Sequence, residues 1–198
     1  MIFRWIMQRM ILSQENFLEM IKVVPQVQSE NVMKMSSEGV ELLKAIEEYR
    51  SHPYDDQDGK DIENWVPGAT VGFGHLIKAS VWPDFRGREV GVVEADELFA
   101  QDIAPFEECV MSAIDDSYQL PENEFDALVI LAYNIGQRGF SSSSVVKIIN
   151  DIDAETSYDT LEDAWKAWNR SQGAVMNGLI NRRAAEWDIY CDGNYERW

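Results

Sequence analysis

The sequence has few cysteines and no long apolar run, and each of these absences argues against one class of protein. Its 198 residues include only two cysteines, Cys109 and Cys191, which lie outside any spacing typical of a zinc site or a disulfide scaffold. A single long-range disulfide between them stays open. No stretch approaches the roughly 18 consecutive apolar residues that cross a bilayer. We therefore expect no metal site and no stable membrane insertion.

Basic residues are also scarce. The chain has 17 Lys and Arg against 35 Asp and Glu, which gives a net charge of −18. Such a charge repels phosphate backbones, so nucleic acid is excluded as a partner. The excess lies after residue 36, because the first 36 residues hold four basic and three acidic side chains. We interpret the acidic stretch 151–163 as a solvated face.

The composition that remains is that of a folded globule, with 45% hydrophobic and 11% aromatic residues. The length suits one domain with an appendage. We predict an N-terminal helical extension or linker over residues 1–35 and one domain over 36–198. Arg4 and Arg9 interrupt the first apolar run and no small-residue cleavage site follows. The chain is therefore expected to be made in the cytoplasm without a clear signal peptide.

Helical periodicity dominates the predicted domain. A helix over Gly39–Tyr49 can be capped by Ser36 or Ser37, and Pro121–Gly136 is apolar on nearly every side, which predicts a buried central helix. Glycines and prolines over about 52–78 favour a small antiparallel β lobe. The other expected elements are a helix from Glu94, helices over Ser143–Asn150, Thr160–Trp168 and Leu179–Tyr190, and a glycine-bearing loop over Ser171–Gly178. The fold class is α+β, mainly helical, with a small β lobe and a larger helical lobe flanking a cleft, the usual place for a ligand.

Two carboxyl groups have the contrast that glycosidic bond cleavage requires. Glu47 lies at the edge of the first helix's apolar stripe, where burial would favour its protonated form. Asp56 follows nine residues later in a polar turn region that would keep it ionised. One carboxyl could then donate a proton while the other acts on water. In a chain with 35 acidic residues, however, these two features alone favour ordinary surface acids at both positions.

A second segment, ATVGFGHL, contains Thr70, Gly72, Gly74 and His75. Its alternating glycines let a strand bend and let a ligand approach the backbone. It lacks the third glycine and the following helix of a dinucleotide-binding loop. A lone histidine is more often structural than catalytic, so we predict a structural role for His75.

Four blocks together resemble a known family. They are GVELLKAIEEYRSHPYDD, GATVGFGH, FDALVILAYNIGQRGFSSSS and GLINRRAAEWDIY, in this order over about residues 36–190. They look like the phage-type lysozymes, the endolysins and muramidases of glycoside hydrolase family 24. Related domains also occur in antibacterial effectors, so residues 1–35 could join the domain to a larger ancestor.

The resemblance implies roles for individual residues. It makes Glu47, Asp56 and Thr70 catalytic, although Glu48 stands where relatives usually have glycine. It makes Tyr133 and Asn134 substrate-binding. Three further residues are expected to support the site without reacting: His75 with Asp102 as its partner, and Arg182 or its neighbour Arg183 near the catalytic glutamate. A guanidinium beside Glu47 would oppose the effect of burial, which leaves the direction of the pKa shift of Glu47 open.

The implied reaction is hydrolysis of the β-1,4 bond from N-acetylmuramic acid to N-acetylglucosamine in peptidoglycan, without a cofactor. Glu47 would protonate the leaving oxygen while Asp56 and Thr70 position water. We expect a monomer acting on the cell wall, in the periplasm or outside the cell, as a phage endolysin or effector module, with an immunity or inhibitor protein as a candidate partner. The alternatives are an inactive binding or regulatory protein on the same fold and a lytic transglycosylase.

Overall fold

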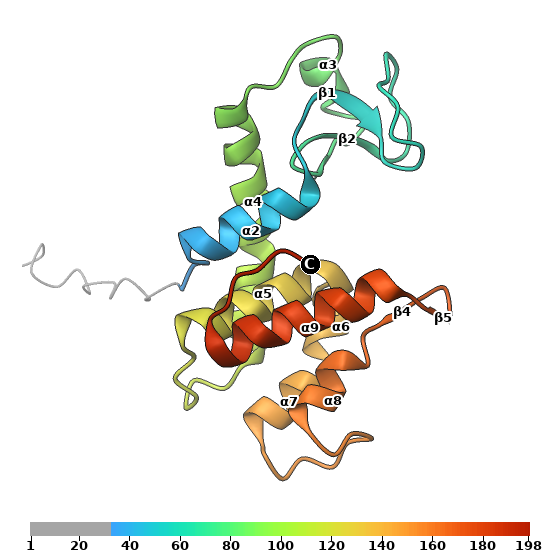
Figure 1. The fold of residues 1–198 in the computed structure, drawn as a ribbon. Coiled ribbons are helices and arrows are strands. Elements are labelled where there is room, and N and C mark those ends of the chain that lie inside the picture. The colour runs from blue at the N-terminus through green and yellow to red at the C-terminus, as the bar shows by residue number, and fades with distance from the viewer. Residues whose placement is uncertain (1–32) are drawn as a thin grey trace, which may run out of the picture. The chain divides into compact units, whose positions relative to one another are not determined.

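The computed structural model describes residues 33–198, in which the chain passes from a helix into a small sheet and then through a series of helices (Figure 1). The predicted extension over 1–35 therefore lies, except for its last three residues, outside the described part. The elements are α2 (Ser37–Glu47), β1 (Arg50–Asp55), β2 (Ala69–Gly72), β3 (His75–Leu76), α3 (Trp82–Phe85), α4 (Val92–Ala113), α5 (Glu122–Ile135), α6 (Gln137–Ser141), α7 (Ser144–Asn150), α8 (Leu161–Lys166), β4 (Arg170–Ser171), β5 (Ala174–Val175) and α9 (Asn177–Asp192).

Helix α2 begins and ends for local reasons. The Ser36 hydroxyl accepts a hydrogen bond from the Gly39 amide (3.0 Å) and caps the first turn, where Glu38 also favours the helix dipole. The helix ends at Glu47 because Glu48 adopts a φ of 57°. The predicted helix Gly39–Tyr49 is thus confirmed, with both ends shifted by two residues toward the N-terminus.

The β lobe is a three-stranded antiparallel sheet in the order β1-β2-β3. In its register Tyr54 lies opposite Thr70, and Thr70 lies opposite Leu76. Gly72 and Gly74 both have positive φ angles, 66° and 87°, which glycine adopts without steric cost, so the chain can turn from β2 into β3. The β lobe predicted over about 52–78 is therefore present, with its first strand starting at Arg50.

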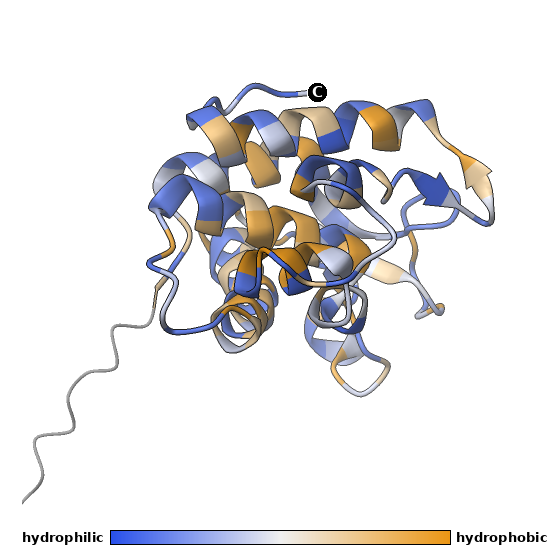
Figure 2. Cartoon of the chain, turned by 90° about the horizontal axis from the view of Figure 1, so that it is seen from below, coloured by the Kyte–Doolittle hydropathy of each residue, from blue (hydrophilic) through white to orange (hydrophobic). Residues whose placement is uncertain are grey.

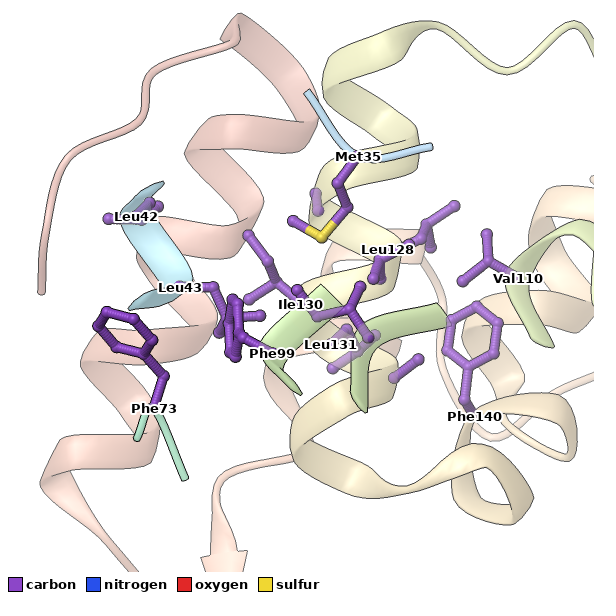
Figure 3. Packing of buried hydrophobic residues seen from close by; sticks show 14 of the residues in the cluster. Met35, Leu42, Leu43, Phe73, Phe99, Val110, Leu128, Ile130, Leu131 and Phe140 are labelled. Atoms are coloured by element: carbon purple, nitrogen blue, oxygen red, sulfur yellow. The ribbon is translucent and has the colours of Figure 1, made fainter. Parts of the chain in front are cut away.

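The core surrounds α5, whose residues from Phe125 to Ala132 are all buried. Helices α9, α4 and α2 pack against it, and Figure 3 shows Leu43 and Phe99 beside Ile130 and Leu131 of this core. Hydrophobic residues gather in the central helices and hydrophilic ones along the outer loops (Figure 2). The predicted central helix is confirmed, and its all-round burial follows from its apolar residues on every side.

Two buried carboxylates hold the chain where it enters α2. Glu107 of α4 accepts hydrogen bonds from the Met35 amide (2.9 Å) and the Lys34 ammonium (2.7 Å). Asp126 of α5, which is fully buried, accepts from the Ser36 amide (2.9 Å) and the Ser36 hydroxyl. The chain from Lys34 onward is thus attached to the core, two residues before the domain start expected from the sequence.

Three further features concern the helical lobe. The loop expected over Ser171–Gly178 overlaps the β4–β5 hairpin, whose two-residue turn is formed by Gln172 (φ 48°) and Gly173 (φ 82°), and its last two residues already belong to α9. Cys109 and Cys191 are both free, so the disulfide left open by the sequence is absent. Over residues 33–198, no helix combines the length and apolarity that crossing a bilayer requires.

Candidate functional site

Glu47 is the last residue of α2, where the chain leaves the helical lobe for β1. Its side chain points toward the turn between β2 and β3. A methyl group placed on Gly74 would lie 3.5 Å from Glu47 Oε2 and 3.8 Å from Tyr133 Oη. The end of α2, the β turn and α5 therefore meet at this carboxyl group.

The pKa of Glu47 is raised above its ordinary value. Partial burial is the main cause, because it disfavours the ionised form, and the positive charge of Arg182 opposes it. The sequence left this direction open, and the structure decides it in favour of burial. A carboxyl group with a raised pKa is suited to donating a proton near neutral pH.

Asp56 and Thr70 converge on Gly68 in the β lobe. The Asp56 amide and the Thr70 hydroxyl both donate to the Gly68 carbonyl oxygen, at 3.1 and 2.9 Å. Asp56 is exposed whereas Thr70 is buried in β2. Since the Thr70 hydroxyl donates its hydrogen to the backbone, it can only accept a hydrogen bond from a further group.

Tyr54 of β1 connects the two carboxyl groups electrostatically. Burial raises the pKa of Tyr54, the guanidinium of Arg50 lowers it, and the negative charges of Glu47 and Asp56 raise it further. Arg50 lies over the Tyr54 ring at 4.6 Å. The charges of both carboxyl groups thus act on the same phenol.

Tyr133 and Asn134 lie at the end of α5 that faces this region. Burial, followed by the charges of Glu47 and Asp102, raises the pKa of Tyr133, so its hydroxyl stays protonated and can donate. Asn134 is exposed, and its Oδ1 accepts a hydrogen bond from Arg183 Nη2 at 2.8 Å. Tyr133 therefore lies beside Glu47, and the substrate-binding role of both residues stays a prediction.

The structure separates the roles of two neighbouring arginines. Arg182 is the one whose charge acts on Glu47, whereas Arg183 is fully buried. Both donate to Glu186 Oε1, Arg182 through Nε at 3.0 Å and Arg183 through Nη2 at 2.6 Å, and the Trp165 indole donates to Glu186 Oε2 at 3.1 Å. Sequence reasoning missed Glu186, although its spacing of three and four residues from the arginines on one helix was a usable signal.

His75 and Asp102 form a pair that joins β3 to α4. His75 Nδ1 lies 2.9 Å from Asp102 Oδ2 and 3.1 Å from Oδ1. The imidazole also lies 5.9 Å from the ring of Phe85, centre to centre. This pairing agrees with the expected partnership of the two residues, and their supporting role stays a prediction.

Known proteins share this architecture. A family model described as phage lysozyme matches residues 44–186. The chain belongs to the phage lysozyme family. An endolysin of Bacillus phage PZA is 32% identical over 165 residues, which cover 81% of this chain and 56% of that protein, so the chain spans only a little over half of this relative. An endolysin of Escherichia coli O157:H7 phage FAHEc1 has a similar structure, with a TM-score of 0.65, 29% identity, and coverage of 83% of this chain and 98% of that one.

A second solved structure matches this chain as well. It is the muramidase domain of SpmX from Asticaccaulis excentricus, with a TM-score of 0.61, 30% identity, and coverage of 80% of this chain and 97% of that one. These likenesses confirm the expected lysozyme fold. Among residues 33–198, no three histidine, cysteine or acidic side chains are grouped as a metal ion would require.

Proposed function

We propose that this lysozyme domain hydrolyses peptidoglycan and acts as a muramidase on the β-1,4 bond from N-acetylmuramic acid to N-acetylglucosamine. One observation carries the proposal: the half-buried Glu47 carboxyl group, whose pKa burial raises, lies beside Gly74 and Tyr133, where α2 meets the β lobe that carries the exposed Asp56. Its family membership and its similarity to proteins named endolysin and muramidase domain support the same conclusion.

In the proposed reaction Glu47 is the general acid. Its proton goes to the glycosidic oxygen as the bond from that oxygen to the anomeric carbon breaks. A water molecule attacks the anomeric carbon from the opposite face, and Asp56 takes one of its protons. The Thr70 hydroxyl, whose hydrogen is already donated to Gly68, accepts a hydrogen bond from that water and orients it. This is an inverting mechanism, which needs a carboxyl separation of roughly 6.5–9.5 Å to admit the water.

Substrate contacts come from α5 in this proposal. The Tyr133 hydroxyl remains protonated and lies close to Gly74 and Glu47, so it can donate to a sugar oxygen beside the scissile bond. Asn134 is held by Arg183 and offers an exposed amide. In the cell we place the activity on the bacterial wall, as an endolysin or as a module of an antibacterial effector.

Substitution of Glu47 by glutamine tests the proposal, because glutamine keeps the size of the side chain and cannot donate an acid proton. We expect Glu47→Gln to slow the clearing of a purified peptidoglycan suspension by about 100-fold or more. The matched control is Glu48→Gln, which changes the exposed neighbouring carboxyl and should clear the suspension at nearly the original rate. If a folded Glu47→Gln protein still clears the suspension at the original rate, Glu47 is not the general acid.

The products separate the remaining alternatives. Hydrolysis leaves reducing ends, whereas a lytic transglycosylase leaves 1,6-anhydromuramic ends that mass spectrometry detects. If the unaltered chain produces 1,6-anhydromuramic ends, its reaction is transglycosylation and not hydrolysis. A chain that clears no peptidoglycan at any pH would instead be a binding or regulatory protein on the lysozyme fold.

A further inference from the structure

The segment after α9 returns across the helical lobe toward the candidate site. Gly193 ends α9 in a left-handed conformation (φ 66°) that reverses the chain. Residues 194–198, called here the return segment, then run back beside α9 (Figure 1). The Tyr195 hydroxyl donates to Asp126 Oδ2 at 2.7 Å, which attaches the start of this segment to the buried carboxylate of α5.

The return segment places Trp198 on Arg182. The guanidinium carbon of Arg182 lies 5.2 Å from the centre of the Trp198 ring, within the range of a cation–π contact. Trp198 is partly buried and packs against the hydrophobic core. The other partners of this guanidinium are Glu186 Oε1, at 3.0 Å, and the Ile130 carbonyl oxygen, at 3.4 Å. With these contacts only 9% of the Arg182 side chain is exposed.

A second contact of the return segment is weak by comparison. Arg197 Nη2 lies 3.9 Å from Glu48 Oε1, and both side chains are more than half exposed. Exposed ion pairs of this kind add little to stability. The segment is therefore held mainly by Tyr195 at its start and by Trp198 at the guanidinium.

We propose that Trp198 is a positioning residue: its indole ring holds the guanidinium of Arg182 at the place from which its positive charge acts on the Glu47 carboxyl group. The effect of this positioning on catalysis rests on the proposed function. The sequence pattern that indicated Glu47 and Arg182 does not include the return segment. Trp198 reaches Arg182 only because the chain reverses its direction at Gly193.

The groups that face Glu47 determine the direction of the effect. They are Arg182 from α9, the Tyr133 hydroxyl from α5, the Tyr54 hydroxyl from β1 and the adjacent Glu48. Arg182 is the cation whose charge lowers the pKa of Glu47. Without the indole ring, water reaches the guanidinium and its position becomes variable, so its attraction for the carboxylate weakens. The pKa of Glu47 then rises further.

The experiment follows the titration of Glu47 and the pH profile of peptidoglycan clearing in the full chain. In Trp198→Ala we expect the alkaline limb of kcat/KM, and the Glu47 side-chain carboxyl resonance in ¹³C NMR, to titrate roughly 0.3–1 pH unit higher than in the unaltered chain. Trp198→Phe keeps an aromatic face over Arg182 and should restore most of the original titration. Arg197→Gln removes the neighbouring charge alone and should leave both readouts unchanged.

Three outcomes would overturn the proposal: an unchanged titration in Trp198→Ala, a shift to lower pH, or an equal shift in Trp198→Phe. If thermal unfolding shows that Trp198→Ala does not fold, Trp198→Leu replaces it with a side chain that fills space but has no aromatic face. The NMR titration reports on Glu47 without any turnover. It therefore tests the positioning role even if Glu47→Gln retains activity and the proposed reaction fails.

Discussion

The buried carboxylate of Asp126 offers the sharpest test of how the helical lobe is held together. Its two oxygens accept hydrogen bonds from the Ser36 amide, the Ser36 hydroxyl and the Tyr195 hydroxyl. Asp126→Ala leaves these three donors without their partner, two of them on a residue that is only 8% exposed. Each buried unsatisfied donor costs about 1–3 kcal/mol, so we expect a loss of about 3–5 kcal/mol in the free energy of unfolding. A domain of this size unfolds with about 5–15 kcal/mol in total.

Thermal unfolding followed by circular dichroism at neutral pH measures this loss. For a domain of about 150–250 residues each kcal/mol lowers Tm by about 2–4 °C, which gives a fall of roughly 6–20 °C for Asp126→Ala. Tyr195→Phe removes one of the three bonds and should lower Tm by only about 2–4 °C. Gly39→Ala, usually favourable within a helix, should also destabilise here because its methyl group would lie 2.6 Å from Asp126 Oδ2. A fall of less than about 2 °C in Asp126→Ala would show that water satisfies the donors and would refute the reasoning.

Three further outcomes are expected. Gly68→Ala should cost about 1–3 kcal/mol and reduce clearing, because Gly68 has a φ of 98° and an added methyl group would overlap Asp56 Oδ1. Gly59→Ala is the control: Gly59 has a φ of 71° and nothing within 4 Å of an added methyl group, so this variant should cost only about 1 kcal/mol and leave clearing intact. Glu48→Gly should raise the free energy of unfolding by about 1 kcal/mol in urea titrations, because it relieves a positive φ of 57° at an exposed residue. Glu47→Gln should melt higher than the unaltered chain at pH 7: a carboxyl whose pKa is raised by folding loses stability as pH rises from its ordinary value through the raised one, so the difference should vanish at low pH.

Much of the fold could be predicted from local pattern. The serine cap before α2, the apolar residues on every side of α5 and the glycines around Phe73 each act over a few neighbouring residues. These signals located the first helix, the central helix and the β lobe to within a few residues. The β4–β5 hairpin was missed because its strands are only two residues long and their side chains are exposed, which leaves no alternation to detect.

The candidate site, too, could be predicted only in part from the sequence. The sequence indicated Glu47 and Asp56 by residue type and position, and Thr70 only through the family resemblance. The glycine that relatives usually carry at position 48 corresponds to the positive φ that Glu48 adopts. The sequence could not show that the Thr70 hydroxyl is already donated to Gly68. That bond depends on how β2 and the loop before it are placed in space.

By itself, then, the sequence determined the first helix, the central helix and the β lobe, because these follow from side-chain type and short-range spacing. Together with the family resemblance it also indicated which residues could carry acid and base chemistry. Only the tertiary structure decided that burial outweighs Arg182 at Glu47, and that Glu186 and Trp198 hold that guanidinium. A pKa depends on burial and on distances between charges. Both are set when α2, α5, α9 and the segment after it pack together.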